Sequence, residues 1–216
     1  MNARPIAFAE LPPLATSHRY DGLSLREARS RFFAEQGIPA DGGYDAKVVP
    51  IYFGKLHIWD MPNVENRKKA VRFHDLHHVI AGYPTDWSGE GRISAWEISS
   101  GCARYPAALW INLHGIGVGL FTSPVGTFRA LVRGGRSGNL YPTDPEAFAA
   151  LEERKVEDVR ADLNLDQDGE APTPKESLRA LGILAGSSLF SLLHILPFFL
   201  LLSWVWTRLS AGGLGF

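Results

Sequence analysis

The sequence predicts a mostly α-helical protein, a multi-helix bundle followed by a C-terminal apolar helical segment. Three observations support this fold class. Several segments of helical length carry start and stop signals, segments with the alternating pattern of strands are scarce, and an apolar run of 28 residues lies near the C-terminus. With 45% hydrophobic and 21% charged residues in a chain of 216, the composition is that of a globular protein with a sizeable core.

The first helix is expected over residues 24–37. Ser24 and Glu27 have the spacing of a capping box, and a Gly-Ile-Pro sequence ends the segment. The following residues, 41–59, are loop-like and contain a short extended piece at about 48–53.

Two further helices are expected on either side of a Gly-Tyr-Pro break. The first runs from about 64 to 81, after a Pro-Asn start, and stops at Gly82. The second runs from about 88 to 100, after polar residues that can cap its start. A chain that ends one helix, turns and starts another can bring side chains of the two helices together.

The middle of the chain predicts buried helices and one amphipathic helix. Residues 103–134 are apolar and rich in small side chains, and Pro106 and Pro124 interrupt them. Residues 143–165 form the clearest amphipathic pattern, with Asp144 as the N-cap and a proline in the first helical position.

The C-terminal run, residues 180–207, contains His194 as its only ionisable group. About 20 apolar residues in a helix suffice to cross a bilayer core, so we expect this run to associate with a membrane, with Pro197 kinking or splitting it. The alternatives are a buried helix pair or a dimer interface. The expected organisation is a helical metal-binding domain, a linker and a hydrophobic membrane-associated segment, at 1–165, 166–177 and 178–216.

Charge and cysteine content restrict the function. The formal net charge is −1 and no long basic block occurs, which argues against a nucleic-acid partner. Cys102 is the only cysteine, so an internal disulfide and an all-cysteine metal site are excluded. The N-terminus lacks an apolar stretch of signal-peptide length, and we expect the metal domain on the cytoplasmic side.

The sequence HDLHH, at 74–78, predicts part of a metal site. His74 and His78 have the i, i+4 spacing with which one helix face presents two imidazoles to one metal. Each helical residue advances about 100°, so Asp75 lies within the same arc of about 100°. His77 points to the other side of His74 and is a bystander, suited to a supporting or solvent-facing role.

A further ligand is expected from the next helix. Glu90 lies near its start, where the turn after Gly-Tyr-Pro can return it to the histidines. Glu97, seven residues on, occupies the same helical face and is the reserve candidate, a supporting residue alongside His77. Two imidazoles and two carboxylates suit Zn²⁺, Fe²⁺, Mn²⁺ or Co²⁺ without choosing among them.

The spacing H-D-x-x-H, eleven residues, E resembles the signature of a known family. The family comprises coenzyme Q (ubiquinone) biosynthesis proteins, the fourth of the named COQ proteins, and HDLHHVIAGYPTDWSGEGRISAWE resembles its bacterial members. The resemblance is strongest over residues 60–135 and weaker over 143–165. It does not extend to residues 1–40 or to the apolar run from 180.

The resemblance implies a mostly helical fold, a bound divalent metal, and association with membranes and polyprenylated quinone precursors. It also implies oxidative decarboxylation, in which a hydroxyl replaces the carboxyl group at ring carbon one, or a role in organising other quinone biosynthesis enzymes. By position, the implied ligands are His74, Asp75, His78 and Glu90. The chain has no flavin or nicotinamide fingerprint, so oxidation would require O₂.

Two other functions fit the same residues. One is a non-catalytic lipid-binding scaffold for quinone biosynthesis, with a structural metal. The other is a metal hydrolase, in which HDxxH resembles HExxH and Asp75 acts as the general base. A homodimer is a further possible partner arrangement under any of these functions. Five residues are candidates for lining a channel for an isoprenoid tail, although tight helix packing would use the same small residues: Trp110, His114, Gly115, Gly117 and Gly119.

Overall fold

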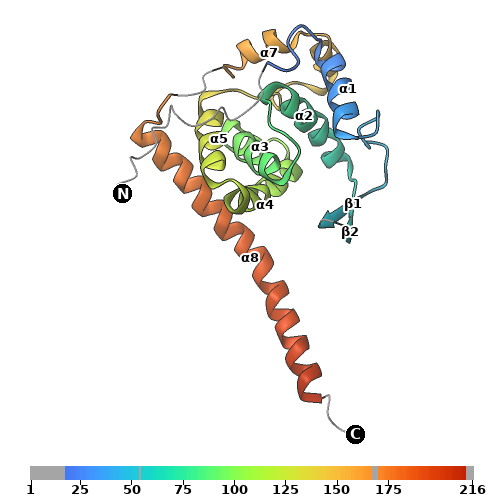
Figure 1. Ribbon diagram of the computed structural model, residues 1–216, viewed down its shortest axis with the longest axis vertical. Coiled ribbons are helices and arrows are strands. Elements are labelled where there is room, and N and C mark those ends of the chain that lie inside the picture. The colour runs from blue at the N-terminus through green and yellow to red at the C-terminus, as the bar shows by residue number, and fades with distance from the viewer. Residues whose placement is uncertain (1–17, 54, 167–169, 213–216) are drawn as a thin grey trace, which may run out of the picture.

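The computed structural model describes residues 18–53, 55–166 and 170–212, and confirms a mostly α-helical fold with an apolar C-terminal helix. Helices pack around a central helix, and the last helix extends beyond them (Figure 1). The elements, in chain order, are α1 (Leu25–Gln36), β1 (Val48–Phe53), β2 (Leu56–Pro62), α2 (Glu65–Ala81), α3 (Trp87–Ser100), α4 (Pro106–Thr122), α5 (Pro124–Arg136), η2 (Pro145–Ala147), α6 (Phe148–Glu152), α7 (Val156–Asp162) and α8 (Pro174–Gly212).

Helix α1 begins and ends as its sequence predicts. The backbone N–H of Glu27 donates to the Ser24 hydroxyl at 3.3 Å, and the Ser24 N–H donates to the Glu27 carboxylate at 2.8 Å, which completes the capping box. Gly37 follows with a φ of 68°, a conformation that glycine adopts without the penalty of a Cβ atom. The Phe32 ring of α1 stacks on His78 of α2.

The segment predicted as loop-like forms an antiparallel hairpin of β1 and β2. The extended piece at 48–53 is confirmed as β1, whereas β2 was not predicted. Its pairing depends on β1, since the register pairs Val48 with Pro62 and shifts between Ile51 and Tyr52. An irregular pair of strands gives a weak alternating pattern in the sequence.

Helices α2 and α3 lie within one residue of their predicted bounds. Gly82 ends α2 with a φ of 74°, and the Asp86 carboxylate caps α3 by accepting from the Gly89 N–H at 2.6 Å. The short connection between them places the first turn of α3 beside the last turns of α2. Glu90, in that first turn, thereby reaches the histidines.

Helix α3 lies between α4 and α5, and small residues permit the close approach (Figure 1). A Cβ atom added at Gly91 would overlap the backbone of Gly119, and one added at Gly115 would overlap the Ser94 side chain. Gly117 faces Ser191 of α8, and a Cβ atom added at Gly117 would lie 3.4 Å from the Ser191 hydroxyl oxygen. Gly115, Gly117 and Gly119 of α4 are therefore contact points between helices. A channel along them stays a prediction.

Substitution of Gly91 by alanine should lower the melting temperature of the protein. The added methyl group has to push α3 away from Gly119, which costs about 1–3 kcal/mol. For a chain of this length, each kcal/mol corresponds to roughly 2–4 °C. Thermal melts in detergent with a chelator measure the effect. Gly182→Ala is the matched control, because nothing lies within 4 Å of its added methyl group, and its melting temperature should not fall.

The prolines and the amphipathic segment behave differently from the expectation. Pro106 and Pro124 occupy the first turns of α4 and α5, where the missing N–H costs nothing.

The prediction of a single helix over 143–165 is wrong, because the structure divides this segment into η2, α6 and α7. The break occurs where Leu25 N donates to the Arg154 carbonyl at 2.9 Å and Val156 N donates to the Leu23 carbonyl at 3.0 Å. These bonds to the start of α1 replace intrahelical ones.

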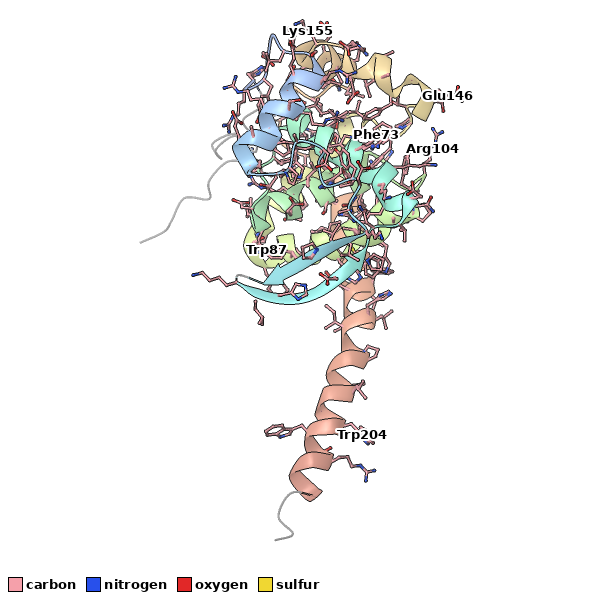
Figure 2. The ribbon with its side chains drawn as sticks, turned by 90° about the vertical axis from the view of Figure 1, so that its right-hand side faces the viewer. Phe73, Trp87, Arg104, Glu146, Lys155 and Trp204 are labelled. Atoms are coloured by element: carbon pink, nitrogen blue, oxygen red, sulfur yellow. The ribbon has the colours of Figure 1, made fainter. Side chains whose placement is uncertain are left out.

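Helix α8 starts in the segment predicted as a linker and continues as one helix through Pro197, so it is not split there. Its N-terminal half packs on α4 and α5 as far as Ser191, whose hydroxyl donates to the Leu113 carbonyl of α4 at 3.3 Å. The Arg179 guanidinium donates to the Ser99 carbonyl of α3 at 2.8 Å. The rest extends beyond the other elements, with Trp204 far from the helical body that holds Phe73 (Figure 2).

This helix is long and apolar enough to cross a membrane. The candidate span is Pro174–Pro197, with a mean hydropathy of 1.7, and 11% of its most apolar window is buried. A core helix of a soluble domain would be mostly buried, so α8 is not a core helix of this chain. Leu193 is 60% exposed, and Trp206 is 72% exposed. Such an apolar surface associates with a membrane or with another apolar surface.

Candidate metal centre

Three side chains from α2 and α3 converge on one point. His74 and His78 come from successive turns of α2, and Glu90 comes from the first turn of α3. Their ligand atoms lie within 4.8 Å of one another and could hold a metal ion. His78 Nε2 is 3.3 Å from Glu90 Oε1, His74 Nε2 is 3.5 Å from Glu90 Oε2, and the two Nε2 atoms are 3.1 Å apart. Two imidazoles bound tetrahedrally at about 2.0–2.1 Å would have nitrogens about 3.3 Å apart.

Hydrogen bonds on the far side of each ring fix its tautomer. His78 Nδ1 donates to the Tyr83 carbonyl at 2.9 Å, and His74 Nδ1 donates to the Glu97 carboxylate at 2.9 Å. Since a carbonyl and a carboxylate only accept, both Nδ1 atoms carry hydrogen. Both Nε2 lone pairs therefore face the same point, which is unfavourable unless a cation or a proton lies between them. This is the usual arrangement of metal-binding histidines.

Helix α1 also restrains the site. The Phe32 ring stacks on His78 with centroids 5.7 Å apart and planes at 18°. His78 is almost fully buried, whereas the Glu90 side chain is 38% exposed. The two imidazoles are thus rigidly placed, and Glu90 closes the site from the solvent side.

Glu97 does not join the three converging groups and instead supports them. Its Oε1 accepts from the Nδ1 atoms of His74 and His77, and its Oε2 accepts from the Asn112 amide at 2.5 Å and the Tyr141 hydroxyl at 2.8 Å. Burial alone would raise the pKa of Glu97, but the charge of His74 and the hydrogen bonds from His74 and His77 hold it well below its ordinary value. Glu97 is therefore an ionised carboxylate with every strong acceptor position in use.

His77 is fully buried and has no solvent-facing role. Its Nδ1 donates to Glu97 at 2.7 Å, and its Nε2 accepts from the Leu140 backbone N–H at 3.0 Å. Both nitrogens are thus engaged by the protein, and burial lowers the pKa of the ring below its ordinary value. His77 joins α2 to the loop after α5 and helps to place Glu97.

Asp75 is not brought into the group formed by His74, His78 and Glu90. Its Oδ2 accepts from the Tyr44 hydroxyl at 2.5 Å, and burial raises the pKa of its carboxyl group. The two side chains connect α2 to the loop before β1. A direct bond from Asp75 to the metal stays a prediction.

A cavity of about 190 Å³ adjoins the converging groups. An engineered cavity of about 150 Å³ holds benzene, so this volume accommodates roughly one substituted aromatic ring. Its polar lining comprises Arg67, His74, Glu90, Ser94, Glu97, Asn112 and Tyr141. Its apolar lining comprises Met61, Ala70, Val71, Ala107, Ala108 and Ile111. A ring in this cavity would lie beside His74 and Glu90, whereas Trp110 and His114 are not among the lining residues.

Zinc binding at pH 7 should release about one proton from His74. Burial opposes the charged imidazole, but Glu97 and Glu90 outweigh it and raise the pKa of His74 well above its ordinary value. The metal-free ring is therefore protonated at pH 7, and it must lose that proton to bind zinc. Affinity should rise about tenfold per pH unit until the pKa of His74 is passed. Calorimetry in two buffers of different ionisation enthalpy measures the proton release, because the buffer that takes up the proton adds its own heat to the heat of zinc binding. Equal heats of zinc binding in the two buffers would contradict the prediction.

Several residues of the site were not predicted from the sequence. Tyr44, Asn112 and Tyr141 come from a loop, from α4 and from the segment after α5, and they carry no local signal of a metal site. Arg67 has a weak signal, because it lies seven residues before His74 on the same face of α2. The chain matches no protein-family model, no curated protein and no solved structure.

Proposed function

We propose that the protein is a membrane-associated, metal-dependent enzyme of ubiquinone biosynthesis that acts on a polyprenylated benzoquinone precursor. One observation carries the proposal: His74 and Glu90, two of the three converging groups, line a cavity that accommodates one aromatic ring. A divalent metal held there would act as a Lewis acid toward a phenol oxygen of the ring. The proposed reaction replaces the carboxyl group at ring carbon one with a hydroxyl whose oxygen comes from water, releases CO₂ and reduces one O₂ to H₂O₂.

The size of the cavity supports a ligand whose apolar tail lies outside it. A volume of about 190 Å³ is filled by one substituted ring, which leaves no room for a polyprenyl chain. Ile111, at the edge of the cavity, is 37% exposed, and the neighbouring Trp110 is 47% exposed. These apolar side chains of α4 offer a surface for the tail, and α8 packs on the same helix.

The protein's residues have three tasks in this proposal. His74, His78 and Glu90 hold the metal, while Glu97 keeps the His74 ring in the orientation that presents Nε2. The apolar lining of the cavity excludes water from the ring. The resemblance in the motif from His74 to Glu90 supports the pathway.

Profiling of quinone intermediates in a strain lacking the protein tests the pathway and the reaction. A precursor that still carries its ring carboxyl group should accumulate, and wild-type protein should restore the quinone. Unchanged quinone levels in the deletion strain would remove the pathway assignment.

The Glu90→Ala variant distinguishes the proposed enzyme from the non-catalytic scaffold. Exposed α8 and the cavity would also suit a protein that only holds a lipid precursor. A Glu90→Ala protein that is present at wild-type level and restores quinone synthesis would favour the scaffold. The hydrolase alternative has less support, because Asp75, its general base, is engaged by Tyr44.

Membrane association through α8 should be lost when a charge enters the middle of its apolar run. Leu193 is 60% exposed and lies at the middle of the apolar run 180–207, and an arginine near the centre of a membrane helix costs about 2.5–3.5 kcal/mol on insertion scales. Leu193→Arg should therefore float less with liposomes in a density gradient. Leu178→Arg is the control, because Leu178 is exposed near the polar start of α8. Equal flotation of Leu193→Arg and wild type would argue against a membrane role for this run.

A further inference from the structure

Arg67 of α2 lines the ring-sized cavity, and only some of its guanidinium donors form hydrogen bonds within the described part of the chain. Its Nη1 donates to Asn63 Oδ1 at 2.8 Å. Its Nε is shielded from solvent and has no hydrogen-bond partner among the residues that the structure describes. A buried donor without a partner is costly, so such a group in a cavity wall points to a ligand.

Asn63 holds the guanidinium in one orientation. The Asn63 amide donates to the backbone carbonyls of Ala46 at 2.8 Å and Tyr44 at 3.2 Å, so its Oδ1 faces Arg67. With Nη1 engaged, the edge of the guanidinium that has no hydrogen-bond partner among the described residues is the one formed by Nε and Nη2. This edge presents two parallel N–H donors, the geometry that matches the two oxygens of a carboxylate.

The charge of Arg67 is also not paired within the described part of the chain. Burial lowers the pKa of its guanidinium, and Asp75 is the acidic group that opposes this shift. The Asp75 carboxylate accepts from Tyr44 instead, and no ion pair joins it to Arg67. Because an arginine stays protonated in proteins, the cavity wall carries a positive charge that an anionic ligand would neutralise.

Arg67 and the candidate metal ligands lie at two ends of one cavity. Arg67 and His74 are seven residues apart on α2, two turns along the same face, with about 10.5 Å of axial rise between them. Ala70 and Val71 form the apolar wall in between. An aromatic ring against this wall would have substituents directed to both ends.

We propose that Arg67 binds the carboxylate of a ring-shaped ligand through its Nε and Nη2 donors, and so selects a carboxylated aromatic ring over a neutral one. This inference rests on the proposed function only for the identity of the cavity as the substrate site. The carboxylate lies at the Arg67 end, and the other ring substituents face His74 and Glu90.

Binding of benzoate and benzamide to the full-length protein in detergent tests the inference. The titrations are done by calorimetry with metal-free protein, so that benzoate has no metal to bind. Wild type should bind benzoate more tightly than benzamide, and Arg67→Gln should weaken benzoate binding roughly 10- to 100-fold while leaving benzamide unchanged. Arg67→Lys should bind benzoate with an intermediate affinity, because it keeps the charge and loses the paired donors.

Arg72→Gln is the matched control, since Arg72 lies on the same helix and lines other cavities. Benzoate binding should be as in wild type. Equal affinities of wild type for benzoate and benzamide would overturn the inference, as would unchanged benzoate binding in Arg67→Gln. The first outcome needs no variant, so a failure of Arg67→Gln to fold leaves the test intact. Since the assay measures binding alone, its failure is distinct from unchanged quinone levels in the deletion strain.

Discussion

Replacement of Glu90 by alanine is expected to remove tight metal binding, as is replacement of His78. Wild-type protein should bind one divalent ion per chain, because three groups supply one converging site. Removal of a residue that only orients a metal ligand costs about 10- to 100-fold in affinity, so the loss of a direct ligand should exceed about 100-fold. Elemental analysis of the purified protein and competition with a chromogenic chelator measure the content and the affinity.

His57→Ala is the control for this series, because His57 lies on the exposed hairpin and its Nε2 is 2.9 Å from Asp60. Its metal content should equal that of wild type. Asp75→Ala belongs in the same series, and a loss as large as that of Glu90→Ala would add Asp75 to the ligands. Absence of metal from wild type under metal-replete growth would refute the central claim.

The metal should also stabilise the fold. An ion that binds only the folded protein adds about 4 kcal/mol when its free concentration is 1,000 times its dissociation constant. A chelator should therefore lower the melting temperature of wild type and leave that of Glu90→Ala unchanged.

The parts of the fold that the sequence predicts depend on neighbours close in the chain. The capping box at Ser24 and the glycines after α1 and α2 act within one helical turn. The bounds of these helices could therefore be predicted from the sequence. The convergence of His74, His78 and Glu90 could be predicted for the same reason, since only a helical turn and one short connection separate them. Local geometry was sufficient in each case.

The parts that were not predicted depend on contacts between distant segments. The interruption between α6 and α7 follows from hydrogen bonds to Leu23 and Leu25, which lie more than 100 residues earlier. Strand β2 depends on its pairing with β1. A helical pattern in the sequence shows which residues can form a helix, and it does not show which backbone groups another segment will engage.

The cavity and the residues that support the candidate site also depend on contacts between distant segments of the chain. Asn112 and Tyr141 reach Glu97 from α4 and from the loop after α5, and nothing in their own surroundings in the sequence marks them. Glu97 was predicted as a reserve ligand from its helical face. The face was correct, but the donors from other elements determine that it supports His74.

Replacement of Glu97 by glutamine is expected to destabilise the fold and to weaken metal binding together. Each carboxylate oxygen accepts two hydrogen bonds, from His74 and His77 on one side and from Asn112 and Tyr141 on the other. An amide group has one accepting oxygen, so its NH₂ must face two donors. Unpartnered donors and a lost buried charge should cost about 3–5 kcal/mol, or roughly 6–20 °C in melting temperature for a chain of this length.

The metal affinity should fall by about 10- to 100-fold in the same variant, because His74 loses the partner that fixes its ring. Glu65→Gln is the control, since Glu65 is an exposed partner of Lys68 at 2.8 Å, and neither its melting temperature nor its metal affinity should change. Thermal melts with a chelator separate the intrinsic loss of stability from the loss of bound metal. If Glu97→Gln melts like wild type in the chelator and binds metal more weakly, Glu97 only orients His74. If it melts lower and binds metal normally, Glu97 only joins α3 to its neighbours. Because one carboxylate accepts from His74 and from three other donors, both properties should change together.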